Sequence, residues 1–335
     1  MYPSFNADDL QKAGVTGKDA FTMQNDRAKL QNDVRTTLLQ GLAGVVVAIG
    51  AYATWRQVRN SQEVHSTDRF IRAIDQLGRP DKTLEISLGG ILGLERVARD
   101  SSRDKRSIGE ILTAYIRSRE REFADAGDVG LPSLARRSPD TQAAISVLGR
   151  NGFSDVKLYV EDDVRVLDLS GTDLRHADLS NLDLRAADLH SARLYRAFVI
   201  RADFSYVDFG SADMAHFIGN ASRFDNAWFH NADCTDGHFD SAAFKHAILQ
   251  GADFQGAHLV RADFRFALLG EANFSGANLR EARFEGAVAD ETTVWPAGFD
   301  PSSAGIHLTR FNSRHTPFTP ATTSPAERQR LAEGG

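Results

Sequence analysis

The stretch that decides the fold is QGADFQGAHLVRADFRFALLGEANF, residues 250–274. A bulky apolar residue returns at every fifth position in it, as Phe254, Leu259, Phe264, Leu269 and Phe274. A five-residue step turns an α-helix by about 500°, so these side chains would scatter around the helix axis. On a β-strand an odd step alternates between the two faces of the sheet. The pattern therefore fits neither an amphipathic helix nor an ordinary strand.

A chain that turns a corner after every five residues buries all of these side chains together. Four five-residue sides then make one square coil, and successive coils stack at about 4.8 Å, the spacing of paired strands. The register holds from Leu169 to Phe284, which is twenty-four consecutive pentads or six coils. We therefore expect a four-sided coil over residues 161–290.

The interior of this coil is predicted from the small and large residues of each pentad. Two positions before each large residue stands a small one, usually alanine, and both are expected to point inward, where space is tight. Phe217 breaks the pattern, because it replaces the alanine and is followed by Gly219 at the large position. We expect Phe217 to turn inward into volume left by Gly219 and Gly237. Positions twenty apart form interior columns, one of which predicts a ladder of stacked rings: Phe204, Phe224, Phe244, Phe264 and Phe284.

These repeats resemble the pentapeptide-repeat family, whose A(D/N)LXX motif forms a right-handed four-sided β-helix. RADFSYVDFGSADM, QGADFQG and EANFSGANL match the motif closely, and TTVWPAGFDP is similar to the segment that often follows the last coil. NDVRTTLLQGLAG, TDRFIRAIDQLG and GGILGLERVARDS resemble a membrane-anchored subgroup. The resemblance implies a mainly β protein, in which a right-handed four-sided β-helix of pentapeptide repeats follows an α-helical module and a single N-terminal transmembrane helix.

Residues 36–55 form one long uncharged stretch, TTLLQGLAGVVVAIGAYATW. Twenty helical residues span about 30 Å, the thickness of the hydrocarbon core of a bilayer. Tyr52 and Trp55 suit a membrane interface, whereas Gln40 and three glycines lower the hydrophobicity. We expect a single-pass transmembrane span here, inside a long helix over 21–62. A slight excess of Arg after the span favours a cell-membrane protein with its β-helix in the cytoplasm.

Weaker patterns divide the rest of the chain. Apolar residues at helical spacing predict a small α-helical module over 65–150. Residues 291–300 are expected to cap the last coil, and Pro and polar steps predict a flexible tail over 301–335. Residues 1–20 are expected to be disordered.

The residue types and their spacing do not indicate an enzyme. A coil filled with Phe, Leu and Ala leaves no substrate cavity, and the sequence lacks a Gly-rich phosphate loop, HExxH, a nucleophile elbow and CxxC. Cys234 falls on an interior column as a small core residue. His238 and His258 lie one coil apart, but two ligands without a third make a poor zinc site. We therefore expect no catalytic, cofactor-binding or metal-binding residue, and no cofactor.

The outer walls carry one asymmetry. At the position before the large residue, one wall changes from Asp168, Asp188 and Asp208 to three apolar residues, and a neighbouring wall holds two more. Exposed apolar stripes of this kind usually mark a contact surface. The alternative is that the α-helical module or the tail covers them. The candidate interaction stripe comprises Trp228, Ile248, Leu268, Phe198 and Ile218.

Two functions follow from these observations. The first is a membrane-anchored scaffold that binds protein partners, or a second copy as a homodimer, through the walls of the β-helix. The second is a DNA mimic that binds or protects DNA gyrase or another topoisomerase. Residues 161–290 hold twelve Lys/Arg against twenty-one Asp/Glu, which fits a mimic and disfavours direct nucleic-acid binding. Arg193, Arg223 and Arg283 interrupt the acidic walls, so the scaffold is favoured.

Overall fold

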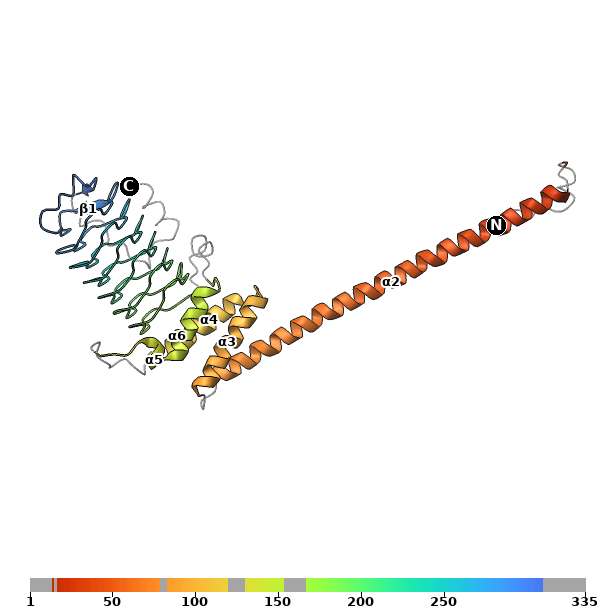
Figure 1. The fold of residues 1–335 in the computed structure, drawn as a ribbon, viewed down its shortest axis with the longest axis horizontal. Helices are drawn as coiled ribbons and strands as arrows, with labels where there is room; N and C mark the ends of the chain where they lie inside the picture. The colour runs from red at the N-terminus through yellow and green to blue at the C-terminus, as the bar shows by residue number, and fades with distance from the viewer. Residues whose placement is uncertain (1–13, 15–16, 79–82, 120–129, 154–166, 310–335) are drawn as a thin grey trace. The chain divides into compact units, whose positions relative to one another are not determined.

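The computed structural model describes residues 14, 17–78, 83–119, 130–153 and 167–309 of the chain (Figure 1). The chain divides into two compact units, residues 1–67 and 68–335, and each is described by itself. The described helices and strands are α2 (Gly17–Gly78), α3 (Leu84–Asp100), α4 (Lys105–Ser118), α5 (Leu134–Arg137), α6 (Pro139–Arg150), β1 (Val288–Asp290) and β2 (His307–Thr309).

Helix α2 makes up most of the described part of the first unit, and it is longer than expected. We expected one helix over 21–62 and a separate helix after residue 65, but α2 runs without a break to Gly78. No glycine or proline occurs between Arg56 and Leu77, so the sequence contains no helix breaker there. Residues 17–20, which we expected to be disordered, form the first turn of α2, and most of residues 1–16 lie outside the described residues.

The transmembrane span expected over 36–55 is not confirmed. Within the described residues, no helix has both the length and the apolar character needed to cross a bilayer. Gln40 and the three glycines of this segment dilute its apolar run. The side chains of six residues in it lie outside the described part of the structure, namely Leu39, Leu42, Ala43, Val45, Val46 and Trp55.

In the second unit, α3, α4 and α6 pack against one another through apolar faces. Ile91 and Leu94 from α3, Ile108 from α4, and Ile145 and Leu148 from α6 are all fully buried. These side chains belong to one continuous apolar core that also includes the interior of the β-helix. The helices therefore form the first layer of the β-helical body (Figure 1).

The expected β-helix of stacked coils is confirmed over residues 167–294. Parallel bridges join residues twenty apart, from the pair Asp168 and Asp188 to the pair Leu268 and Val288. The final bridge joins Asn273 to Val294, so one extra residue enters the last turn. Regular backbone hydrogen bonds accompany these bridges, such as the 2.7 Å bond from the Phe224 N–H to the Ala243 carbonyl.

The interior of the β-helix is a closed stack of aromatic and aliphatic side chains. The alanine and the large residue of most pentads are fully buried. Trp295 closes the far end of the stack, with its ring 5.2 Å from Phe274 and 5.0 Å from Phe299. Rings twenty residues apart lie 4.8 to 5.8 Å from each other along the ladder of Phe204, Phe224, Phe244, Phe264 and Phe284.

The recurrent Asp and Asn residues of the motif stabilise the corners of the coil. The carboxylate of Asp203 accepts the Ser205 N–H at 3.0 Å, and the carboxylate of Asp233 accepts the Thr235 N–H at 3.0 Å. The residue after each of these donors has a positive φ, as in Tyr206 at 65°. Short polar side chains that bind the backbone two residues ahead favour such turns. These carboxylates are therefore turn residues.

Phe217 points inward, as expected. It is fully buried and stacks on Phe239 with ring centroids 5.6 Å apart. A Cβ atom on Gly219 would lie 3.0 Å from the Phe217 ring, so this glycine does provide the space. Gly237 leaves space for a different ring, because a Cβ atom on Gly237 would lie 2.5 Å from the Phe239 ring. The expectation was right for Gly219 and wrong for Gly237.

Helices α5 and α6 take the place of a preceding coil at the start of the β-helix. The Leu134 N–H donates to the His176 carbonyl at 3.2 Å, and the Asp183 N–H donates to the Gly149 carbonyl at 2.9 Å. The Gln142 side chain donates to the Asp178 carbonyl at 2.7 Å and accepts its N–H at 3.0 Å. Because an open strand edge invites aggregation, these bonds protect the first coil.

A buried ionic cluster joins this cap to the first coil. Asp173 lies 3.1 Å from the Arg137 guanidinium and 2.6 Å from that of Arg175, which is fully buried. Burial by itself raises the pKa of Asp173, but the two guanidiniums outweigh it and hold the pKa below its usual value. Burial lowers the pKa of Arg137. The cluster is stable only as a set, because removal of one partner leaves buried charge uncompensated.

The chain remains ordered beyond the expected cap at 291–300. Ile306 is buried, and β2 pairs in parallel with β1, with His307 opposite Val288. The segment 301–309 is therefore part of the folded body and was wrongly assigned to the flexible tail. Residues 310–335 lie outside the described residues.

We predict that Gly219→Ala lowers the free energy of unfolding by about 2 kcal/mol, because its Cβ meets the rings of Phe217 and Phe239 at 3.0 and 3.1 Å. Urea denaturation followed by circular dichroism measures the change. Gln255→Ala, on the exposed surface, is the control and should stay within about 0.5 kcal/mol of the wild type. Equal stability of the two variants would contradict the packing described for Phe217.

We predict that Asp173→Asn lowers the free energy of unfolding by about 3 kcal/mol at pH 7, because two buried guanidiniums lose their counter-charge. Asp178→Asn, at an exposed carboxylate, is the control. The depressed pKa of Asp173 means that its stabilisation is present above about pH 4 and is lost as the pH falls further. The difference between wild type and Asp173→Asn should therefore shrink as the pH falls from about 4 to about 2 in denaturation experiments. A difference that stays constant over this range would show that charge is not its cause.

Candidate functional site

One wall of the β-helix displays apolar and aromatic side chains in place of the usual carboxylates. Parallel bridges connect Asp178, Phe198, Ile218, His238 and His258 in one column, each residue one coil from the next. Phe198 is 43% exposed, Ile218 is half-buried, and both histidines are exposed. Phe198 and Ile218 belong to the stripe predicted from the sequence.

A second column lies at the adjacent corner, two residues earlier in each pentad. It contains His176, Arg196 and His216, all with positive φ between 53° and 55°. The Tyr195 ring packs edge-on to both histidines, with centroids 5.9 and 5.5 Å away. The Arg196 guanidinium carbon lies 5.3 Å from the centre of the same ring. Stacking on Tyr195 therefore orders the basic residues of this corner.

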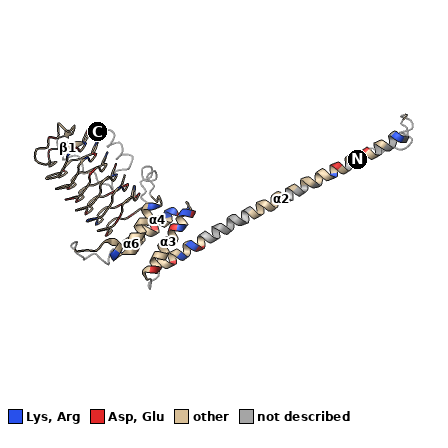
Figure 2. Ribbon diagram, in the orientation of Figure 1, with Lys and Arg blue, Asp and Glu red and all other residues tan. Residues whose placement is uncertain are grey.

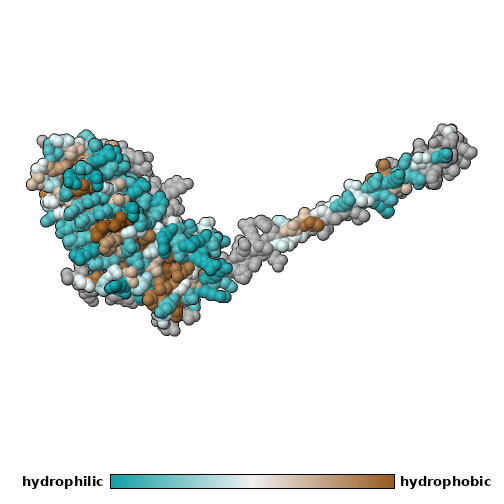
Figure 3. Space-filling model, viewed as in Figure 1, coloured by the Kyte–Doolittle hydropathy of each residue, from teal (hydrophilic) through white to brown (hydrophobic). Residues whose placement is uncertain are grey.

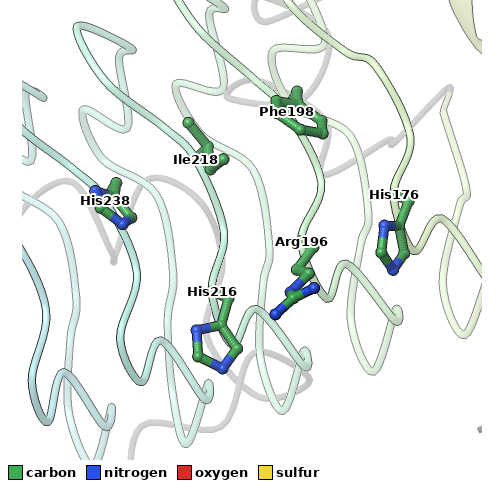
Figure 4. A pocket seen from close by; sticks show the side chains of 6 residues that line it. All are labelled: His176, Arg196, Phe198, His216, Ile218 and His238. Atoms are coloured by element: carbon green, nitrogen blue, oxygen red, sulfur yellow. The ribbon is translucent and has the colours of Figure 1, made fainter. Parts of the chain in front are cut away.

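The two columns enclose an open hollow of about 400 Å³. The residue between them in each pentad points inward, as fully buried Ala197 and Phe217 do, so the wall is recessed there. Figure 4 shows the side chains of the two columns on either side of this recess. The lining residues are His176, Arg196, Phe198, His216, Ile218 and His238.

A second hollow of about 410 Å³ continues the first toward the α-helical cap. It shares His176 and Phe198 with the first, and it adds Ser133, Ala135, Gln142, Asp178 and Ser180. We call the two hollows together the Phe198 groove. The groove therefore extends from α5 and α6 along the first coils of the β-helix.

Backbone groups of the groove are already paired within the β-helix. The Phe198 N–H donates to the Ala177 carbonyl at 2.8 Å, and its carbonyl accepts the Leu179 N–H at 2.7 Å. Ile218 and His238 make the equivalent bonds one and two coils further along. At these residues the groove consequently offers no free strand edge on which another strand could pair.

The other apolar stripe predicted from the sequence is not an exposed surface. Trp228 is 3% exposed and Ile248 is 6% exposed, and Asp208 in the same column is also buried. Leu268 is half-buried. The exposure expected for Trp228 and Ile248 is therefore wrong for this structure, and the interaction expected at this stripe stays a prediction. Figure 3 shows apolar patches on an otherwise mostly hydrophilic face of the β-helix.

Acidic residues on a further wall are neutralised by neighbouring cations. Asp183 lies 2.7 Å from Arg185, and Asp263 lies 2.8 Å from Arg265. Burial raises the pKa of Asp263, but hydrogen bonds and charge from Arg265 outweigh it and hold the pKa below its usual value. This wall therefore alternates in charge. Figure 2 shows further Lys and Arg residues around α4.

The reactive residue types found in the described part of the chain have structural roles. Cys234 is fully buried, and burial raises the pKa of its thiol well above the usual value. His238 and His258 stack with ring centroids 4.5 Å apart, but the described residues contain no group of three potential metal ligands. Burial raises the pKa of Tyr115 to about 12, and its hydroxyl donates to Asp140 at 2.6 Å. That bond ties α4 to α6.

Comparison with protein families agrees with the repeat structure. Residues 168–205, 183–218, 222–259 and 257–293 match the family model for pentapeptide repeats, in eight copies. The match covers the same residues that form the stacked coils. No curated protein matches the chain.

Several solved structures are similar to part of this chain, with TM-scores of 0.30 or less. HetL, a pentapeptide-repeat protein involved in heterocyst differentiation regulation in Nostoc sp. strain PCC 7120, is 20% identical over 42% of this chain and 80% of its own, with a TM-score of 0.30. QnrB1, a plasmid-mediated fluoroquinolone resistance protein, is 16% identical over 44% and 81%, with a TM-score of 0.28. Alr5209, a pentapeptide-repeat protein from Nostoc PCC 7120, is 26% identical over 45% and 89%, with a TM-score of 0.18. From the family match over residues 168–218 and 222–293 and from their stacked five-residue coils, this part of the chain is a pentapeptide-repeat β-helix.

Proposed function

We propose that this protein is a non-enzymatic scaffold that binds a protein partner through the outer wall of its β-helix, at the Phe198 groove. The observation that carries the proposal is the exposure of the Phe198 ring, which is 43% accessible beside half-buried Ile218. The motif places Asp or Asn at this position in many coils, and an exposed aromatic ring there gains free energy only when a ligand covers it. Apolar patches with a polar rim are typical contact surfaces.

The construction of the β-helix supports this role. Its interior is filled by side chains, so binding takes place on the outside. The groove side chains stand on a backbone that is hydrogen-bonded on both sides, and such a surface loses little conformational freedom on binding. Proteins built from pentapeptide repeats are generally structural or interaction proteins rather than catalysts.

The alternative function, a DNA mimic that binds or protects DNA gyrase or another topoisomerase, is not the one we favour. A mimic of duplex DNA presents regular rows of negative charge. Here Arg185, Arg223 and Arg265 pair with carboxylates on one wall, and another wall carries the Phe198 groove. A mimic would also leave the exposed Phe198 ring without a purpose.

Membrane attachment through residues 36–55, with the β-helix in the cytoplasm, stays a separate prediction. Leu38, Val47 and Ile49 are each more than half exposed on α2, as expected of side chains that contact lipid. Extraction of cell membranes with alkaline carbonate should leave the protein in the pellet if the segment is inserted, and should release it after deletion of 36–55. Recovery of the full chain in the soluble fraction would contradict the prediction.

We predict that Phe198→Asp abolishes partner recovery, because a carboxylate replaces the apolar centre of the groove. Cells expressing tagged protein are cross-linked, and co-purified proteins are quantified by mass spectrometry. Phe266→Asp is the matched control, since Phe266 is 48% exposed at a different corner of the β-helix. Thermal unfolding confirms that both variants fold, and sedimentation identifies a homodimer if the partner is a second copy. Equal recovery with the two variants would overturn the proposal.

A further inference from the structure

We infer that the Phe198 groove takes an extended, acidic segment of the partner protein, with an apolar side chain that packs on Phe198. This inference rests on the proposed function and adds the chemistry of the partner. It follows from three properties of the groove, namely its length and openness, its paired backbone, and the charge of its lining.

The length and openness of the groove fit a short peptide segment. From Asp178 to His238, the last residue that lines the groove, the column crosses three coil spacings, which is about 14 Å at the usual distance between paired strands. An extended peptide of four residues spans about 14 Å. Both hollows are open to solvent along this length (Figure 4), whereas sites for small molecules enclose most of their ligand.

Recognition in the groove depends on side chains. The backbone N–H and carbonyl groups of Phe198 and Ile218 are bonded to the coils before and after them. A partner strand therefore has no edge on which to pair. Its specificity comes from an apolar contact with the Phe198 ring and from polar contacts with the corner residues beside it.

The corner residues select for negative charge. Arg196 carries a full positive charge, and His176, His216 and His238 supply imidazole N–H donors around the same hollow. None of the residues that line this hollow is a carboxylate; Asp178 lies in the adjoining hollow. Arg and His side chains pair well with carboxylates. A nucleic-acid ligand is disfavoured, because this hollow is lined by a single arginine, whereas binding a row of phosphates needs clustered Lys and Arg.

Two fluorescent nine-residue peptides test this inference against the full-length protein. In the first, leucine and phenylalanine alternate with glutamate, and in the second lysine replaces every glutamate. We expect the glutamate peptide to bind about tenfold more tightly than the lysine peptide in fluorescence anisotropy at low salt. Its affinity should fall as salt is added, because exposed ion pairs are screened.

Charge reversal at the corner locates the binding site. Arg196→Glu should weaken binding of the glutamate peptide about fivefold or more, because attraction becomes repulsion. Arg201→Glu is the matched control, since Arg201 is also exposed at the corner position with positive φ, but on the next corner of the coil. It should change the affinity less than twofold. Both variants should keep the circular dichroism spectrum of the wild type.

Three outcomes overturn the inference. The two peptides bind with equal affinity, or the glutamate peptide does not bind at 1 mM. The third is that Arg196→Glu and Arg201→Glu weaken binding of the glutamate peptide equally. Failure of the inference is distinguishable from failure of the proposed function. If Phe198→Asp still abolishes partner recovery in cells, the scaffold function stands and only the acidic character of the partner is wrong.

Discussion

The structure depends on one packing constraint, which is that a bulky apolar side chain every fifth residue must reach a closed interior. The coil meets it by turning a corner after each pentad, which brings residues twenty apart into register. Leucine side chains fill the interior next to the α-helical cap, and stacked phenylalanine rings fill it from Phe204 to Trp295. The backbone bonds between coils, the turn carboxylates and the caps at both ends all serve to maintain this stack.

Because the same constraint fills the interior of the β-helix, only its outer walls are available for contacts with other molecules. Inward positions hold mostly alanine and large apolar residues. Outward positions hold a wider range of residues, among them Asp, Arg, His, Ala, Phe and Trp. A wall can therefore change its chemistry from coil to coil without a change in the backbone. The Phe198 groove arises in this way, where Phe198 and Ile218 replace carboxylates beside a corner that carries Arg196 and two histidines.

The repeat, its register and the inward turn of Phe217 could be predicted from the sequence, because steric rules within one pentad determine them. Phe198 and Ile218 were found by the same register. Their neighbours His176, Arg196 and His216 were missed, although they also recur at twenty-residue spacing, because the motif leaves that corner position variable. The burial of Trp228 could not be predicted, since the repeat determines which wall a residue belongs to and not how exposed that wall is. The buried cluster of Arg137, Asp173 and Arg175 depends on tertiary packing between the cap and the first coil.

The central claim is that partners contact the Phe198 wall. A photo-crosslinking amino acid placed at Ile218, and at Ala243 on the adjacent wall as the control, tests this claim in living cells. Ala243 occupies the same position in its pentad and forms equivalent parallel bridges. We predict a discrete crosslinked protein product from position 218 and none from position 243. Crosslinks at both positions with equal yield, or at position 243 alone, would contradict the account.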